Sequence, residues 1–336
     1  MSQAYRQAGV DLEAGARAVA SMAEVVSATY TDEVLSKVGS FGGLFDAGRL
    51  AGLKDPVLVA STDGVGTKVK VAQAMGRWDS IGRDLVHHCI NDILVQGARP
   101  LFFLDFLGCE KLVPEQAAAV VGGVARACGD YGCPLLGGET AEMADVYREG
   151  QLELVGTIVG VVPRAEIIDG SRLSEGDALL AWPSSGLHTN GYTLARKVLA
   201  DLDWNEPNDQ LGCSIGQALL AVHRCYLDSA EIALEAGIDL KGLAHITGGG
   251  IPGNLSRIMP EGLTAEVDLS KVVAPPIFDL IAEKGSLERQ DMLAAFNLGV
   301  GMIAVVPAEQ ARRAREVVPE LIPVGQVVAG TEMIVR

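Results

Sequence analysis

Residues 56–68 read PVLVASTDGVGTK, and the change from apolar to polar residues within this stretch sets the organisation of the rest of the chain. Val57 to Ala60 have the short, β-branched character of a buried strand, and Pro56 marks its start. The residues that follow are acidic, broken by glycines and closed by a lysine. The stretch therefore predicts a strand that ends in a loop suited to a phosphate and a metal.

This loop contains groups that suit a magnesium nucleotide. The oxygens of residues 61–63, Asp63 among them, are ligands that a hard cation prefers. Gly64 and Gly66 allow backbone N–H groups to approach an anion closely, and Lys68 adds a mobile positive charge. The Walker A template does not match, because no glycine directly precedes Lys68. The alternative is a strand-to-helix turn whose glycines serve only backbone geometry.

Length, composition and charge limit the class of protein. A chain of 336 residues with 49% apolar residues and 40 glycines predicts about two compact α/β domains. The net charge of −16 argues against nucleic acid or an anionic membrane as a main partner. The six cysteines show neither a CxxC pair nor a zinc spacing, which indicates reduced thiols. With no signal-peptide pattern and no run of roughly 18 apolar residues, we expect a cytoplasmic protein.

Apolar periodicity predicts helices and strands that alternate along the chain. We expect a domain boundary near residue 170, which gives an N-terminal domain of residues 1–169 and a C-terminal domain of residues 170–336. The helices are expected at about 12–26, 68–75, 79–96, 114–130, 193–202, 214–236, 275–284, 290–295 and 308–317. The longer strands are expected at about 57–60, 101–108, 152–162, 178–182, 300–306 and 322–328, with short strands within 134–147 and 243–258.

Carboxylates elsewhere in the first half can join Asp63 around one cation. Asp92 lies near the end of the helix at 79–96, next to apolar residues. Asp105 stands within an apolar strand, where an acid is usually paired or near the strand end. Glu139 follows two glycines after a further short strand, although an exposed acidic turn is the alternative there.

Three other polar residues of the helix at 79–96 are interpreted as a solvated face. These residues are Asp84, His87 and His88.

Two loops of the second half have the composition of ligand sites. PSSGLHTNGY at 183–192 offers hydroxyls, an amide and an imidazole, enough to bind a phosphate or a sugar, although a surface turn is the alternative. LAHITGGGIPGN at 243–254 reads as a strand, a triple glycine and a helix start, which is a natural anion site. The glycines from Gly248 onward also satisfy G-x-G-x-x-G, and Asp268 follows at nearly the expected distance, so a dehydrogenase is a minor alternative.

Taken together, the segments resemble the phosphoribosylformylglycinamidine cyclo-ligase (aminoimidazole ribonucleotide synthetase) family over nearly the whole chain. The segments that carry this resemblance are YRQAGVDLEAG, GSFGGLF, STDGVGTK, CINDILVQGARPLFFLDF, LLGGETAEM, EIIDGS, SSGLHTNGY, AHITGGGIPGN and FNLGVGM. The resemblance implies an α/β (α+β) fold of two domains. The N-terminal domains are expected to pair into a β-barrel across a homodimer, and the C-terminal domain is expected to be a sheet flanked by helices that completes the substrate site.

The resemblance also implies an activity, the ATP-dependent closure of the imidazole ring in purine biosynthesis. ATP phosphorylates the formamide oxygen of formylglycinamidine ribonucleotide to an iminophosphate, and the neighbouring amidine nitrogen displaces the phosphate. By position, the Mg²⁺ ligands are Asp63 and Asp92, with Asp105 and Glu139 as further candidates. The expected ATP contacts are Asp63, Gly64, Gly66, Thr67, Lys68, Asn91, Gly137, Gly138 and Glu139. Catalytic roles are assigned to Asp92, Lys68 and His245, with His188 as the second histidine. The ribose 5′-phosphate is assigned to Ser184, Ser185, His188, Asn190, Gly248, Gly249 and Gly250.

Sister families share the ATP loops and differ in the acceptor of the phosphate. Selenophosphate synthetase needs a reactive cysteine near an N-terminal glycine loop, and this chain has no cysteine before Cys89. A nickel-hydrogenase maturation protein would need a C-terminal cysteine, whereas this chain ends TEMIVR. Thiamine monophosphate kinase is distinguished by its product, because it releases ADP without forming an aminoimidazole.

Overall fold

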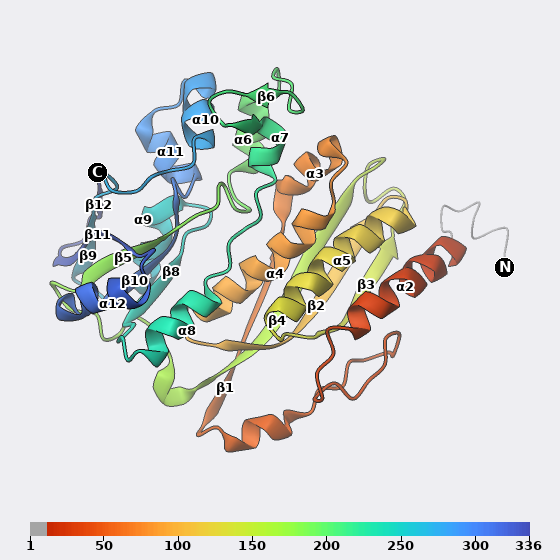
Figure 1. The fold of residues 1–336 in the computed structure, drawn as a ribbon, viewed down its shortest axis with the longest axis horizontal. Helices are drawn as coiled ribbons and strands as arrows, with labels where there is room; N and C mark the ends of the chain where they lie inside the picture. Colours follow the sequence, from red (N-terminus) through yellow and green to blue (C-terminus); the bar gives the residue numbers. More distant parts are fainter. Residues whose placement is uncertain (1–11) are drawn as a thin grey trace. The chain divides into compact units, whose positions relative to one another are not determined.

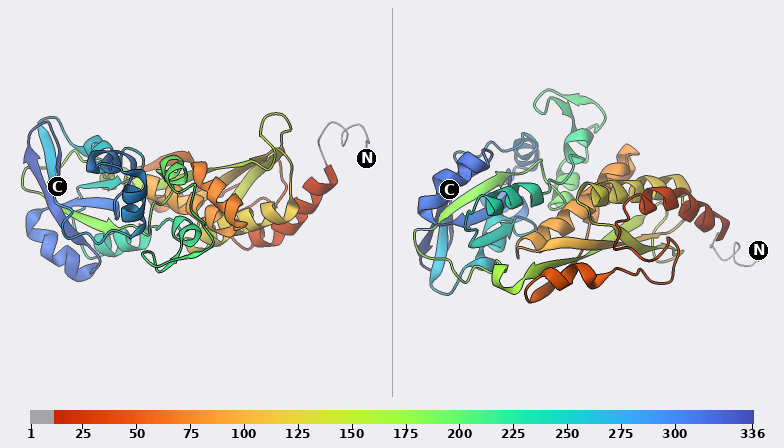
Figure 2. Two further views of the ribbon diagram at one scale, coloured as in Figure 1. Left: turned by 90° about the horizontal axis from the view of Figure 1, so that it is seen from above. Right: turned by 60° about the horizontal axis from the view of Figure 1, so that its bottom comes forward.

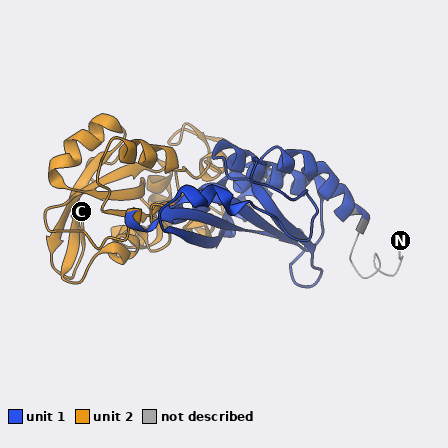
Figure 3. Ribbon diagram, turned by 90° about the horizontal axis from the view of Figure 1, so that it is seen from below, with its two compact units in different colours: residues 1–93, 98–165 blue, residues 94–97, 166–336 orange. Residues whose placement is uncertain are grey.

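The structure is a computed structural model, and it describes residues 12–336. The chain forms two compact units, shown in separate colours in Figure 3. Unit 1 comprises the residues up to 93 together with 98–165, and unit 2 comprises residues 94–97 and 166–336. Each unit has its own sheet with helices packed against it, which confirms the expected α/β fold of two domains.

Unit 1 is built on a four-stranded sheet with the order β1-β4-β2-β3. Its strands are β1 (Pro56–Gly64), β2 (Arg99–Cys109), β3 (Leu135–Glu142) and β4 (Leu152–Pro163). β4 pairs antiparallel with β1 and β2, and β3 lies parallel to β2. The register sets both Asp63 and Asp105 opposite Gly156, so the two aspartates point to the same face of the sheet.

The helices of unit 1 gather on that face. They are α2 (Leu12–Ser27), α3 (Val69–Met75), α4 (Asp79–Leu94) and α5 (Pro114–Asp130), with 3₁₀ turns η1 (Ala47–Gly52) and η2 (Gly66–Lys68). Figure 1 shows α4, α5 and α2 in a row across the sheet. The α4 and α5 backbones cross closely, because a Cβ at Gly82 would lie 2.2 Å from the Val120 carbonyl oxygen. The crossing positions α4 beside the end of β1.

Unit 2 is built on a six-stranded sheet with the order β12-β9-β11-β5-β10-β8. Its strands are β5 (Ala178–Pro183), β8 (Gly242–His245), β9 (Leu263–Val267), β10 (Val300–Val306), β11 (Ile322–Ala329) and β12 (Ile334–Val335). Every residue of β10 is buried, which makes this strand the centre of the core. A small hairpin of β6 (Pro207–Asn208) and β7 (Cys213–Ser214) forms a separate two-stranded sheet and projects from unit 2 (Figure 2).

Short helices connect the strands of unit 2. They are α6 (Tyr192–Val198), α7 (Ile215–Leu219), α8 (Leu227–Glu235), α9 (Gly250–Leu255), α10 (Ile277–Gly285), α11 (Arg289–Ala295) and α12 (Ala311–Val317), with 3₁₀ turns η4 (Ser256–Ile258) and η5 (Ala308–Gln310). A further 3₁₀ turn, η3 (Arg164–Glu166), spans the boundary between the two units in the sequence. None of the helices in the described part of the chain is long and apolar enough to cross a membrane.

Two expectations for unit 2 are wrong. The single helix expected at 214–236 is divided into α7 and α8, and residues 221–226 between them have no regular structure. The dehydrogenase alternative also fails, because β8, the strand before the triple glycine, pairs antiparallel with β10 at the sheet edge. A dinucleotide-binding unit requires a parallel strand pair joined by the helix. The strands β9 and β12 were not expected from the sequence.

Candidate active site

The end of β1 and the second half of α4 bring three ionisable side chains together in unit 1. Nε2 of His88 lies 2.9 Å from a carboxylate oxygen of Asp63 and 3.4 Å from one of Asp92. The Ser61 hydroxyl donates to that same Asp92 oxygen at 3.3 Å. One ligand atom from each of Asp63, His88 and Asp92 lies within 4.8 Å of the others, a spacing that one cation can bridge.

The charges in this cluster support one another. Burial lowers the pKa of His88, but its hydrogen bonds to Asp63 and Asp92 and their negative charges outweigh burial and raise the pKa to about 9. Burial raises the pKa of Asp63, but the hydrogen bond and charge of His88 produce a net lowering. At neutral pH the cluster therefore holds a protonated imidazole between two carboxylates. A cation that binds both carboxylates must replace the charge of His88.

The polar face of α4, which we interpreted as solvated, is buried. Asp84 is fully buried and forms an ion pair with the equally buried Lys68, with 2.8 Å between Nζ and a carboxylate oxygen. His87 is buried with its ring edge against Tyr131, 5.5 Å between centroids. The expectation that Lys68 is a mobile phosphate ligand is wrong in this structure, because its ammonium is enclosed and neutralised inside unit 1.

The other residues that the sequence predicted for this site lie at the end of β1, in η2 and in α4. The Gly64 N–H donates to the Asp63 carboxylate at 2.6 Å, so this group orients Asp63 instead of pointing toward a ligand. Gly66 has a φ of 62°, which explains the need for glycine there. Thr67 is exposed, and Asn91 is fully buried next to Asp92.

Asp105 and the residues around Gly138 form a second group within unit 1. They line a pocket of about 230 Å³ together with α2 and the glycine-containing loop at 37–43. Burial raises the pKa of Asp105 to about 7. β1 and β3 are the two edges of the sheet, and Glu139 is in register with Phe106, on the face opposite to Asp105. Across the sheet, β3 lies roughly three strand spacings, or about 14 Å, from β1. The structure therefore does not bring Glu139 to the cation cluster.

In unit 2 the expected histidines lie in one buried cluster with a third. His188, His223 and His245 are all buried. The His188 and His223 rings stack with centroids 4.0 Å apart and planes 20° apart, and Nε2 of His223 lies 3.1 Å from Nε2 of His245. The Ser185 backbone N–H donates to Nε2 of His188 at 3.1 Å. Nε2 of His188 is therefore an acceptor. The backbone of His188 is left-handed, with a φ of 63°, and this hydrogen bond holds the residue in place.

The polar loops at 183–192 and 243–254, which the sequence indicated as phosphate sites, are stabilised by internal hydrogen bonds. The Ser184 hydroxyl donates to Asn297 at 3.0 Å, and the Ser185 hydroxyl donates to the Val222 carbonyl at 2.5 Å. The amide of Asn254 donates to the Thr247, Gly248 and Gly250 carbonyls, which fixes the shape of the triple-glycine loop at 248–250. A Cβ at Gly248 would lie 3.4 Å from Asn190, so the two loops meet there.

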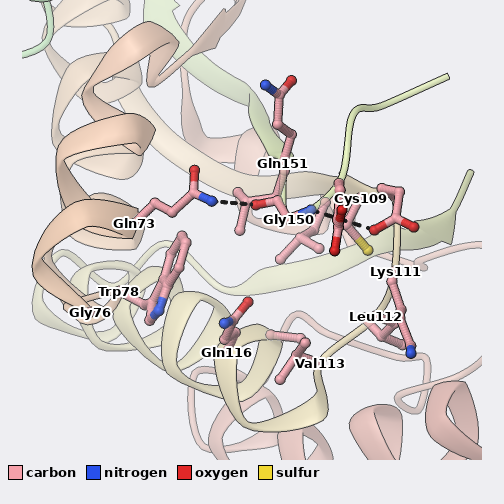
Figure 4. Close-up of a pocket in the computed structure, with 15 residues that line it drawn as sticks. Gln73, Gly76, Trp78, Cys109, Lys111, Leu112, Val113, Gln116, Gly150 and Gln151 are labelled. Carbon is pink, nitrogen blue, oxygen red and sulfur yellow. Dashed lines mark hydrogen bonds between the residues drawn. The ribbon is translucent and has the colours of Figure 1, made fainter. Parts of the chain in front are cut away.

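A further pocket of about 540 Å³ lies in unit 1 between the α3 end, the α5 start and the ends of β2 and β4. Figure 4 shows Trp78 and Gln116 at its wall and the Gln73 amide donating to the Gly150 carbonyl at 2.9 Å. The sequence-expected site residues do not line this pocket.

Sequence reasoning missed His223 and Asn254. His223 falls within the region expected to be one helix, where a histidine has no pattern to mark it. Asn254 is four residues after Gly250, a spacing at which a side chain can bond to a preceding carbonyl, and this was the available signal.

Comparison with protein families gives matches over most of the chain. Residues 46–162 match the model "AIR synthase related protein, N-terminal domain", and residues 174–336 match "AIR synthase related protein, C-terminal domain". Phosphoribosylformylglycinamidine cyclo-ligase of Geobacillus kaustophilus is 48% identical over 314 residues, 93% of this chain and 90% of the relative. The protein of the same name from Desulfitobacterium hafniense is 48% identical over 309 residues, 92% and 91% of the two chains.

Solved structures share the fold at low sequence identity. Thiamine-monophosphate kinase from Stenotrophomonas maltophilia superposes with a TM-score of 0.69 at 19% identity, covering 93% of this chain and 94% of that one. The hydrogenase maturation protein HypE from E. coli superposes with a TM-score of 0.68 at 18% identity, covering 96% and 94%. These likenesses concern the fold alone.

Proposed function

Since the chain belongs to the phosphoribosylformylglycinamidine cyclo-ligase family, we propose that it converts formylglycinamidine ribonucleotide and ATP to 5-aminoimidazole ribonucleotide, ADP and phosphate. The γ-phosphoryl group moves to the formamide oxygen, the amidine nitrogen attacks the activated carbon, and the C–O bond breaks as phosphate leaves. The attacking nitrogen loses its proton on ring closure, and the ring becomes aromatic when a proton moves from the ring CH2 carbon to the exocyclic imine nitrogen. The observation that carries the proposal is 48% identity over 93% of the chain.

The carboxylate cluster of unit 1 supports a role in holding Mg-ATP. Asp63 and Asp92 present oxygens from two different elements, and Mg²⁺ prefers oxygen ligands. When bound, Mg²⁺ neutralises charge on the transferred phosphoryl group. Asp63 and Asp92 would hold the ion, and Ser61 orients Asp92 through its hydrogen bond. A solved HypE of the same fold was determined in complex with ATP, which supports ATP use in this fold.

The pocket that Asp105 lines is assigned to another part of the nucleotide. Its walls combine the glycine-containing loop at 37–43 with Gly137 and Gly138. Because glycine has no side chain, the backbone N–H groups there are suited to contact phosphate oxygens. Asp105 lies there with a pKa of about 7, so near neutral pH it is partly protonated. We therefore assign Asp105 to nucleotide contact in preference to the metal.

In unit 2 we assign proton transfer to His245 and substrate positioning to the loops at 183–192 and 248–250. Nε2 of His188 accepts a hydrogen bond from the Ser185 N–H, and Nε2 of His245 is bonded to Nε2 of His223. His245 ends β8 three residues before Gly248, the start of the triple-glycine loop, and this position suits a group that donates to the formyl oxygen. The loop N–H groups are assigned to the ribose 5′-phosphate.

We also propose that the protein is a cytoplasmic homodimer. The face of the unit 1 sheet that points away from α4 and α5 carries Leu58, 61% exposed, followed by exposed Ala60 and Thr62. Facing strands add the partly buried side chains of Val159 and Phe102. An apolar sheet face of this kind is stable when a second sheet covers it. Leu58→Asp should convert the dimer to a monomer in sedimentation, while Val273→Asp in unit 2 should leave it unchanged.

One assay tests the activity. The purified chain is incubated with formylglycinamidine ribonucleotide, ATP and Mg²⁺, and aminoimidazole and ADP are measured together. Equal release of both products is expected. ADP without aminoimidazole would assign the chain to a sister kinase and overturn the proposal.

The Asp92→Asn variant tests the cation site within the same assay. Turnover should fall by at least about 100-fold because a cation ligand is lost, while the circular dichroism spectrum stays that of the wild type. Asp79→Asn, an exposed acid at the start of the same helix, is the matched control and should keep full activity.

A further inference from the structure

Asp63, His88 and Asp92 in unit 1 have the spacing of ligands to one metal ion. Nε2 of His88 lies 2.9 Å from Oδ2 of Asp63 and 3.4 Å from Oδ2 of Asp92. Two donor atoms that each bind an ion at about 2.1 Å lie about 3.0 Å apart when their bonds are at right angles, and about 3.4 Å apart in a tetrahedral arrangement. Both nitrogen–oxygen spacings therefore match those found around a single ion.

The surrounding elements orient all three side chains. His88 and Asp92 are four residues apart in α4 and share one face of the helix. Oδ1 of Asp63 accepts from the Gly64 N–H, and Oδ2 of Asp92 accepts from the Ser61 hydroxyl. Hydrogen bonds of this kind fix the orientation of metal ligands. The His88 side chain is 5% exposed and that of Asp63 is 47% exposed, so the cluster is closed at the imidazole and open at one carboxylate.

The donor set decides which ions the cluster prefers. Mg²⁺ prefers oxygen ligands, keeps several waters and usually takes only one or two carboxylates from a protein. An imidazole nitrogen is a softer donor and suits first-row transition metals, while carboxylates also suit Mn²⁺. Two carboxylates with one imidazole therefore favour a transition-metal dication over Mg²⁺. Such an ion takes the position of the proton that joins Nε2 of His88 to the carboxylates, and this proton leaves to solvent as the metal–nitrogen bond forms.

We propose that His88 is the third protein ligand of this site, and that the site binds a divalent first-row transition-metal ion, such as Mn²⁺, in preference to Mg²⁺. The proposal rests on the proposed function, because that function places a metal–nucleotide at Asp63 and Asp92. The competing role for His88 is a cationic imidazole that only neutralises the two carboxylates. Removal of the ring separates the two roles. Loss of a ligand weakens transition-metal binding, whereas loss of a competing positive charge strengthens the binding of every dication.

A competition between Mn²⁺ and Mg²⁺ tests the preference. Mn²⁺ alone is titrated into the full chain and followed by electron paramagnetic resonance, and Mg²⁺ is then added. We expect half of the bound Mn²⁺ to be displaced only at an excess of Mg²⁺ of at least about 10-fold, although Mn²⁺ is the weakest binder of its series.

Variants of the two neighbouring histidines show which imidazole is responsible. His88→Gln replaces the imidazole by an amide, and it should lower the Mn²⁺ affinity by at least about 10-fold while the Mg²⁺ affinity changes by less than about 3-fold. His87→Gln is the matched control, because it removes the adjacent buried imidazole, which lies against Tyr131, and it should bind both ions as the wild type does. An equal gain in affinity for both ions in His88→Gln would show that His88 only neutralises the carboxylates, and would reject the proposal.

The metal–nitrogen bond is also read directly, without turnover. Pulsed electron paramagnetic resonance of the Mn²⁺-loaded wild type should show a ¹⁴N coupling that changes when the chain is labelled with ¹⁵N-histidine. The coupling should be lost in His88→Gln and kept in His87→Gln. Bound Mn²⁺ without a nitrogen coupling in the wild type would overturn the proposal, and this result needs no variant to fold. If the chain forms no aminoimidazole with either ion, the proposed function fails while the spectra still decide whether His88 is a ligand.

Discussion

The buried pair of Lys68 and Asp84 allows a stability prediction whose size and pH dependence both follow from the structure. Both side chains are fully buried, with 2.8 Å between Nζ and the carboxylate. Burial lowers the pKa of Lys68, and the charge of Asp84 opposes this effect. The change is Asp84→Asn, which keeps the shape of the side chain but removes the charge that compensates Lys68.

Two routes lead to similar costs at pH 7. Leaving one charge of a buried pair without its partner costs about 3–5 kcal/mol. The chain can instead release the proton of Lys68, and because each pH unit below the ordinary lysine pKa costs about 1.4 kcal/mol, neutralisation costs about 5 kcal/mol at pH 7 and about 2 kcal/mol at pH 9. We therefore expect Asp84→Asn to lower the free energy of unfolding by about 3–5 kcal/mol at pH 7.

The sign of the pH dependence is fixed by proton uptake. In the variant the folded state holds Lys68 with a lowered pKa, so the unfolded state binds more protons and stability rises with pH. The deficit relative to wild type should shrink between pH 7 and pH 9, by up to about 1.4 kcal/mol per pH unit.

Urea unfolding at pH 7, 8 and 9 measures these free energies for the wild type, Asp84→Asn and the double variant Lys68→Met/Asp84→Leu. The double variant should recover most of the loss, because two apolar side chains leave no charge without a partner. Asp79→Asn, an exposed carboxylate in the same helix, should change the free energy by less than about 1 kcal/mol. A wild-type stability for Asp84→Asn, or a deficit that does not change with pH, would refute the assignment of a buried, charged pair.

Two further predictions concern single positions. Burial raises the pKa of Asp105 to about 7, so the folded chain keeps a proton that the unfolded chain loses, and wild-type stability should fall as pH rises between about 4 and 7. Asp105→Asn should remove this fall in a series of Tm measurements. Parallel curves of Tm against pH for the variant and the wild type would contradict the prediction. Gly250→Ala should lower Tm by several degrees, because the φ of Gly250 is 61° and a Cβ there would lie 1.9 Å from the Leu293 carbonyl oxygen. Gly253→Ala should leave Tm unchanged, because a Cβ at Gly253 meets nothing within 4 Å. An equal effect of both changes would count against the packing argument.

The sequence alone determined the elements whose signals are local. The helix expected at 114–130 is α5 at the same bounds, because proline at its start and a continuous small apolar pattern mark both ends. The strands around 57–60, 101–108 and 152–162 were found for the same reason; the structure extends the first two by a few residues and the third by one residue. The family was also recognisable, because its motifs are continuous stretches of chain.

Tertiary structure decided everything that depends on which residues meet. Asp84, His87 and His88 were interpreted as solvated because charge and polarity on a helix face usually indicate water. Their burial follows from partners in other elements, Lys68 in η2 and Asp63 in β1, which no local pattern connects with them.

The same reason explains the cluster in unit 2. From the sequence, His223 was expected to lie within one helix. In the structure the helix is interrupted between α7 and α8, and the His223 imidazole lies against His188 and His245. Hydrophobic periodicity records how each segment faces the core, so the sequence carries the order of helices and strands. Contacts between buried polar groups depend on the register of strands and the crossing of helices, and these are fixed only when the whole unit packs.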